Sequence, residues 1–145
     1  MPAIKIDHCL VCDTIRQELG RKLSLLGFYG VTPNVEIRLE DPDLPIAELA
    51  FVLIGSTSGT AGQVRLQFEV FDTQGHSIFA SPVQSSEVQP SERANFIFGV
   101  RLLKLRHVGH YEFQMRADGQ PVYSTKFLIT SGASPPHPNF PLAAS

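Results

Sequence analysis

Two pairs of side chains in this 145-residue chain have the spacing of metal or redox sites: the C-x-x-C pair Cys9 and Cys12, and the H-x-x-H pair His107 and His110. A structural zinc site usually takes two cysteine pairs, and a redox pair needs a helix N-terminus that stabilises the thiolate. The chain has no second cysteine pair, and residues three apart on a strand point to opposite faces. These four residues are therefore weak metal candidates. We expect buried free thiols, no metal and no cofactor.

Catalytic side chains are not indicated by any motif. The Gly- and Ser-rich stretch 55–62 contains neither G-x-S-x-G, which marks a serine nucleophile, nor G-K-[ST], which marks a phosphate site. We predict no catalytic residue. The alternative is a ligand- or metal-binding β domain, enzymatic or not, whose loops would bring His107 and His110 to a carboxylate such as Asp41 or Asp43.

Composition limits the classes of partner. The formal net charge is −2 and the pI about 6.2, so no basic excess favours nucleic acid. No segment approaches 18 consecutive apolar residues, and the first residues lack the basic and apolar regions of a signal peptide. With two cysteines, these features predict a cytoplasmic protein that binds neither nucleic acid nor membrane.

The elements that must position any site are β-strands. Apolar and polar residues alternate with period 2 over 62–72, 94–103 and 110–117, and 122–129 indicates a last strand. The stretch 47–56 is more uniformly apolar, which indicates a strand covered on both sides. Tight turns are expected at Gly75 and at Asp118-Gly119, whereas 40–45, 56–62 and 81–92 are expected to be loops.

This pattern predicts an all-β, immunoglobulin-like antiparallel sandwich over residues 1–130, followed by an extended Pro-rich tail over 131–145. The expected core is Val52, Ile54, Leu66, Phe68, Val70, Phe96, Phe98, Val100, Tyr111, Phe113, Met115 and Phe127. The segment 107–113 resembles the tyrosine corner of immunoglobulin-like sandwiches, with Tyr111 as the corner residue. Phe113 stands where antibody domains place their second cysteine.

The segment 13–26 can be read as a helix or as a hairpin. A helix would place Ile15, Leu19, Leu23 and Leu26 in one stripe. A hairpin would use Gly20 at its turn, where glycine takes a positive φ at no steric cost, whereas Gly20 inside a helix costs about 1 kcal/mol. We predict an N-terminal β-hairpin.

The same stretch resembles the N-terminal signature of DUF6941, a family of small bacterial proteins of unknown function. The signature is an apolar strand, an acidic residue, a turn with Gly-Lys and a second strand, carried here by Asp13, Glu18, Gly20, Lys22, Leu23, Leu25, Gly27 and Phe28. Arg21 separates Gly20 from Lys22, which departs from the signature and leaves the turn type open. The resemblance implies a β-sandwich and carries no activity.

A sandwich without a catalytic motif is expected to act through its surface, on a protein partner or a second copy of itself. The predicted partner-binding residues are Tyr29, Arg101, Lys104 and Arg106. Phe28 and Tyr29 point to opposite faces of one strand, so one of them can be exposed if the strand lies at an edge. Ordinary burial habits favour the other interpretation, in which Phe28 packs in the core and Tyr29 caps it.

Overall fold

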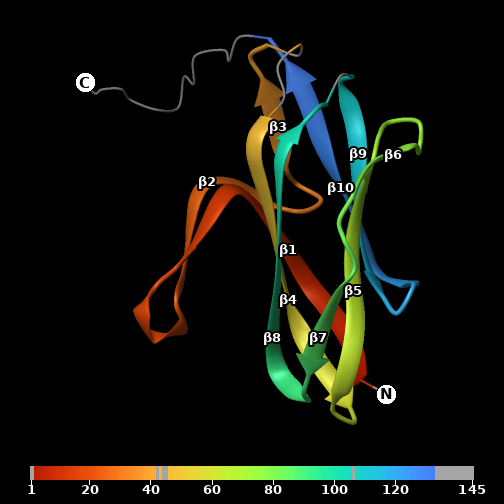
Figure 1. Cartoon of the computed structure of the whole chain (residues 1–145). Helices are drawn as coiled ribbons and strands as arrows, with labels where there is room; N and C mark the ends of the chain where they lie inside the picture. The colour runs from red at the N-terminus through yellow and green to blue at the C-terminus, as the bar shows by residue number, and fades with distance from the viewer. Residues whose placement is uncertain (1, 42, 44–45, 106, 133–145) are drawn as a thin grey trace.

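The computed structural model describes residues 2–41, 43, 46–105 and 107–132, and consists of two β-sheets packed face to face (Figure 1). The four-stranded sheet has the order β2-β1-β4-β8, with strands β1 (Pro2–Gln17), β2 (Leu23–Val31), β4 (Ile46–Gly59) and β8 (Ser91–Leu103). The second sheet has the order β3-β10-β9-β5-β6, with β7 also paired to β5. Its strands are β3 (Glu36–Leu39), β5 (Gly62–Phe71), β6 (Ser77–Ala80), β7 (Gln84–Val88), β9 (Gly109–Ala117) and β10 (Gln120–Ser131). The predicted all-β sandwich is confirmed.

The core lies between the two sheets and is rich in phenylalanine. Phe51 of β4 stacks on Phe113 of β9 at 4.1 Å between ring centroids, and Phe68 and Phe98 pack around this pair. Ten of the twelve predicted core residues are buried. Strand periodicity therefore located most of the core.

Two predicted core residues are not buried. Ile54 is paired with His8 and Asn95 and lies on the outer face of the four-stranded sheet, where 37% of it is exposed. Phe96 is only partly buried, although it packs against the core. Ile54 was predicted from the uniformly apolar stretch 47–56 and Phe96 from alternation, and neither pattern shows how far neighbouring elements extend over a face.

The alternation expected in β8 also fails at its end. Leu102 has a φ of 56° and is exposed, and Leu103 takes the buried position instead. A left-handed residue inside a strand shifts the side-chain phase by one, which explains the exchange.

The N-terminal hairpin is confirmed and the helix alternative is wrong. Gln17 pairs with Leu23, and Gly20 has a φ of 77° in the short 3-10 helix η1 (Leu19–Arg21) at the tip. Figure 1 shows that the hairpin bends away from the sandwich, so that its tip stands apart from both sheets. We call the part beyond Cys12 and before Phe28 the arm.

Two expected loops need correction, and one strand was not expected. Residues 56–59 continue β4, because Lys5, Ile4 and Ala3 pair with Ser56, Thr57 and Ser58. The stretch 81–92 contains β7, which pairs with β5 between the prolines. Strand β3 was not expected; it runs parallel to β10 and covers one edge of the second sheet.

Turn predictions based on residue type are confirmed where the structure describes them. Gly75 has a φ of 84°, and the Asp118-Gly119 turn has φ values of 51° and 79°, as a two-residue hairpin requires. Tyr111 forms the predicted corner: its hydroxyl donates to the His107 carbonyl oxygen at 2.7 Å and accepts from the His107 N–H at 3.2 Å.

Residues 133–145 lie outside the described residues, so the extended tail stays a prediction, as does the single-domain boundary at 130. Within the described ranges, none of the helical structure has the length and hydropathy needed to cross a bilayer.

Candidate functional site

The outer face of the four-stranded sheet carries side chains in rows that run across all four strands. The first row follows from pairing: Phe28 pairs with Cys12, Cys12 with Ala50, and Ala50 with Gly99. The next row contains Val31, Leu10, Val52 and Ile97. Cross-strand partners point to the same face, so both rows lie on the side that faces away from the second sheet.

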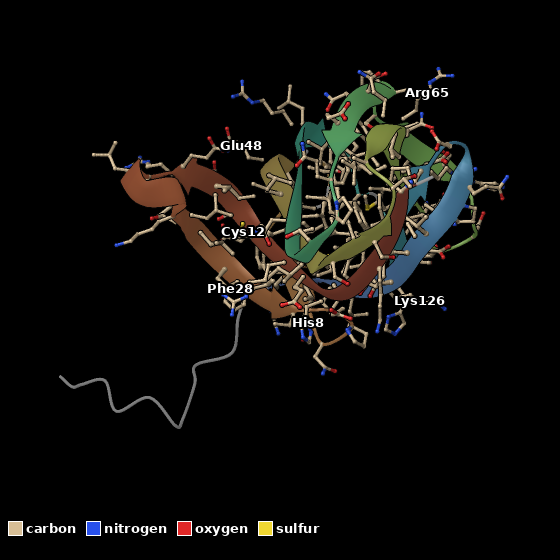
Figure 2. The ribbon with its side chains drawn as sticks, turned by 90° about the horizontal axis from the view of Figure 1, so that it is seen from below. His8, Cys12, Phe28, Glu48, Arg65 and Lys126 are labelled. Atoms are coloured by element: carbon tan, nitrogen blue, oxygen red, sulfur yellow. The ribbon has the colours of Figure 1, made fainter. Side chains whose placement is uncertain are left out.

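Four large apolar side chains of this face are exposed, and we call them the outer apolar face: Phe28, Val31, Ile54 and Ile97. Phe28 is 54% exposed and Ile97 38% exposed, whereas Cys12, Ala50 and Val52 between them are covered by their neighbours. Figure 2 shows Phe28, Cys12 and Glu48 in succession on the side of this sheet that faces away from the second one. An exposed apolar patch on one face is a candidate site for protein–protein contact.

A hollow of about 380 Å³ opens beside this face, where β1 leaves β4 to form the arm. Ala50, Ile97 and Gly99 form its apolar wall, and Gly99 has open space where a side chain would stand. Glu48 and Arg101 form an exposed ion pair at 3.7 Å on its rim. An exposed pair of this kind contributes little to stability, and it gives the apolar face a polar border.

The bend of the hairpin is fixed by Asp13. Its Oδ1 accepts a 2.6 Å hydrogen bond from the Tyr29 hydroxyl, and its carboxyl group packs where a Cβ of Gly27 would stand. Burial, followed by this hydrogen bond and the charge of Asp13, raises the pKa of Tyr29, so the hydroxyl stays a donor. Three residues of the N-terminal signature region thus hold the hairpin at its bend.

Both outer strands of this sheet are open along their outer edges. Within the described ranges, β2 pairs only with β1 and β8 pairs only with β4. β8 is 13 residues long, and an open strand of that length is a template for pairing with another chain.

The predicted partner-binding residues are spread over this region. Tyr29 bonds to Asp13 and packs partly against the core, so the exposed aromatic residue of β2 is Phe28. The expectation that Phe28 is buried is therefore wrong. Arg101 lies on the rim of the hollow, Lys104 lies beyond the end of β8, and Arg106 falls outside the described residues.

The cysteine pair does not form a reactive site. Cys9 belongs to the core between the sheets, whereas Cys12 pairs with Ala50 on the other face, as strand geometry predicts. Both thiols are free and buried. Burial raises the pKa of Cys9 to about 12, and burial together with the charge of Asp13 raises the pKa of Cys12. Both side chains are therefore neutral thiols at neutral pH.

The histidine pair is also separated. The backbone of His107 is bound to Tyr111 in the corner, and His110 is exposed on β9 opposite Leu128. Asp41 accepts a hydrogen bond from the Asp43 N–H and meets neither histidine. In the described part of the chain, no three His, Cys, Asp or Glu side chains gather as metal ligands would.

A second hollow, of about 460 Å³, lies at the end of the sandwich that holds the tyrosine corner. Its lining includes Asp72, Lys104, His107 and Tyr111. The carboxylate near His107 is thus Asp72, which sequence reasoning missed. The signal was present in the turn sequence 72–77, where an aspartate before a glycine can bind its own backbone.

The described region is therefore a β-sandwich with an apolar outer face and open edges. The sequence matches the family model of DUF6941, a family of unknown function, over residues 7–130, and the chain belongs to that family.

Comparison with other proteins gives the fold alone. A search of curated proteins finds no match. Among solved structures, the chain is similar to part of an alkylpurine DNA glycosylase from Pseudomonas fluorescens, with a TM-score of 0.52 and 10% identity over 88% of this chain. It is also similar to part of a glycosyl hydrolase family 2 member from Bacteroides cellulosilyticus, with a TM-score of 0.43 and 12% identity over 74% of this chain. The chain spans 30% and 17% of those two proteins.

Proposed function

We propose that this protein is a non-enzymatic module that acts through protein contact, and that the partner of its outer apolar face is a second copy of the chain. The observation that carries the proposal is the exposure of Phe28, Val31, Ile54 and Ile97 on one face of one sheet. Covering water-exposed apolar side chains with a partner lowers the free energy of the system.

The argument for a second copy is that the β2 edge and the β8 edge of this face are complementary in shape. Consider two copies packed face to face about a two-fold axis parallel to the strands, between β1 and β4. β2 of one copy then lies over β8 of the other. Phe28 faces the open space at Gly99, and Val31 faces Ile97. The contact between Phe28 and the space at Gly99 occurs twice, once from each copy, as a self-complementary interface requires.

The size of the face sets the expected affinity. The face is four strands wide at about 4.8 Å per strand, and about seven residues long at about 3.4 Å per residue, which gives an area of roughly 450 Å² per copy. The roughly 900 Å² buried in total is below the roughly 1,200 Å² of stable specific interfaces, so we expect a weak, reversible dimer. The arm adds a second reason for a partner, because a two-stranded hairpin alone is only marginally stable in water.

We further infer that the sandwich is of the immunoglobulin-like type and that the protein is cytoplasmic. The tyrosine corner and the strand order support the first inference, because β1, β4 and β8 form one sheet and β5, β9 and β10 belong to the other. Supporting the second are two buried cysteines that remain free thiols, as a reducing compartment favours.

The test is sedimentation velocity over a wide concentration range with two matched variants. Ile97→Lys places a charge in the outer apolar face, and Val83→Lys places one at a 46% exposed valine between β6 and β7. We expect the sedimentation coefficients of the native protein and of Val83→Lys to rise with concentration. The sedimentation coefficient of Ile97→Lys should stay at the value of the monomer.

A native protein that stays monomeric up to millimolar concentration would overturn self-association. Equal association by Ile97→Lys and the native protein would show that another surface is used, and would overturn the assignment to this face.

A further inference from the structure

We propose that the hollow at the corner end of the sandwich is a binding site for a small amphipathic monocarboxylate, with an apolar body and one negative charge. This site is separate from the outer apolar face and does not depend on self-association. Its volume of about 460 Å³ is in the range of small-molecule sites.

Two segments far apart in the sequence form the walls of the cavity. Ile78 and Phe79 of β6 supply one apolar wall, and the end of β8 supplies the other through Leu102 and Leu103. The Tyr111 side chain, held by its two hydrogen bonds to His107, lies between them. The apolar part is therefore built on strands and on a fixed corner, which favours a preformed cavity.

The acidic group of the cavity is already engaged in hydrogen bonds. Asp72 Oδ1 accepts hydrogen bonds from the N–H groups of Gln74 at 2.9 Å and His76 at 2.8 Å, and Oδ2 lies 3.7 Å from His76 Nδ1. These hydrogen bonds lower the pKa of Asp72, with further contributions from the charges of His76 and His107. Asp72 is thus an ionised carboxylate whose Oδ1 is committed to the turn.

The basic group of the cavity is not neutralised. Within the described ranges, Lys104 has no acidic side chain at ion-pair distance. Its ammonium group is thus a positive charge without a direct ion-pair partner, next to the apolar walls. A ligand with one negative charge and an apolar body can pair with this ammonium group and cover the apolar walls at the same time.

Leu102 supports the same assignment from the rim. It is 68% exposed in a left-handed conformation, which a leucine rarely adopts. Strained residues of this kind cluster at ligand sites, where the surrounding structure over-determines them. A further hollow of similar size, lined by residues 56–59 and 90–92, is bordered mainly by Ser, Thr and Gly and has no comparable apolar wall.

The experiment is a titration of the ¹⁵N-labelled full chain with octanoate, followed by ¹H–¹⁵N correlation spectra. Octan-1-ol provides the same apolar body without the charge, and acetate the charge without the body. We expect shifts confined to the backbone amides of 72–79 and 102–111, saturating with octanoate and weaker with either control.

Two variants test the role of the charge. Lys104→Met keeps the apolar stem and should weaken octanoate binding roughly tenfold, the loss of about 1.4 kcal/mol expected for a charge-assisted contact. Lys126→Met removes a lysine from the exposed face of β10, on the second sheet (Figure 2), and should leave the affinity unchanged.

Three results would overturn the proposal: no saturable shifts at about 10 mM octanoate, shifts centred on another part of the chain, or equal affinities for native protein and Lys104→Met. A well-dispersed spectrum of each variant would show that the variant is folded, so that a loss of binding is not a loss of folding.

Discussion

The hydroxyl of Tyr111 binds both the N–H and the carbonyl oxygen of His107, four residues before it. This pair closes the connection between β8 and β9, and so between the two sheets. It also places His107 and Tyr111 side by side in the lining of the corner cavity. One aromatic residue therefore serves both the fold and the proposed binding site.

Replacing Tyr111 by Phe should lower the free energy of unfolding by about 1–3 kcal/mol, because two backbone groups of His107 lose their partner while the ring stays in place. Urea unfolding measures this loss. The control is Tyr123→Phe, whose hydroxyl makes only a 3.5 Å contact with Thr32, and which should cost much less. Equal losses in the two variants would contradict a structural role for the corner.

The Phe51–Phe113 stack lies at the centre of the core. Phe113→Ala should lower the free energy of unfolding by about 3–5 kcal/mol, because it removes a fully buried ring and leaves a cavity. Phe28→Ala, measured at a concentration where the protein is monomeric, is the matched control at an exposed position. A loss below 1 kcal/mol for Phe113→Ala would contradict the assignment of β9 to the core.

Two glycines of the hairpin separate backbone strain from close contact. Gly20 and Gly27 both have positive φ, but only Gly27 has another side chain, Asp13, where its Cβ would stand. Gly20→Ala should cost about 1–2 kcal/mol, the penalty of a left-handed residue. Gly27→Ala should cost about 2 kcal/mol more, because Asp13 must move and its hydrogen bond from Tyr29 is lost. Thermal or urea unfolding of both variants measures the difference, and equal losses would show that Asp13 is free to move.

Much of the fold could be predicted from local chemistry. Period-2 patterns found the buried phenylalanines of β5, β8 and β9, and glycine and Asp-Gly marked the turns at Gly75 and Asp118. The corner at Tyr111 was recognisable from its spacing to Gly109. Each of these features depends on residues that are close in sequence, or on a face that repeats along one strand.

The candidate sites depend on features that periodicity does not encode. Whether Phe28 or Tyr29 is exposed depends on the bend at Asp13 and on the pairing shift between Val11 and Cys12. The cavity at Lys104 depends on the left-handed Leu102 and on a turn at Asp72, about 30 residues earlier. Such long-range placement has no local signature, so neither site could be assembled from the sequence.

The buried thiol of Cys9 makes stability depend on pH at the alkaline end. Burial raises its pKa to about 12 in the folded protein, from an ordinary value of 9.0. The unfolded chain therefore releases this proton first, and the stability that the neutral thiol contributes is present below about pH 9 and lost between about pH 9 and 12. The slope for this group is at most about 1.4 kcal/mol per pH unit.

The measurement is the free energy of urea unfolding between about pH 8 and pH 10, for the native protein and for Cys9→Ala. Other groups titrate in this range, so the quantity that reports on Cys9 is the difference between the two curves. We expect that difference to shrink as the pH rises, because the native protein loses the contribution of its thiol while Cys9→Ala has none to lose. Thiol labelling with a disulfide reagent near pH 8 gives a second readout, in which both cysteines should react only after unfolding. Rapid labelling of the folded protein, or two curves that stay parallel, would contradict a buried, neutral Cys9.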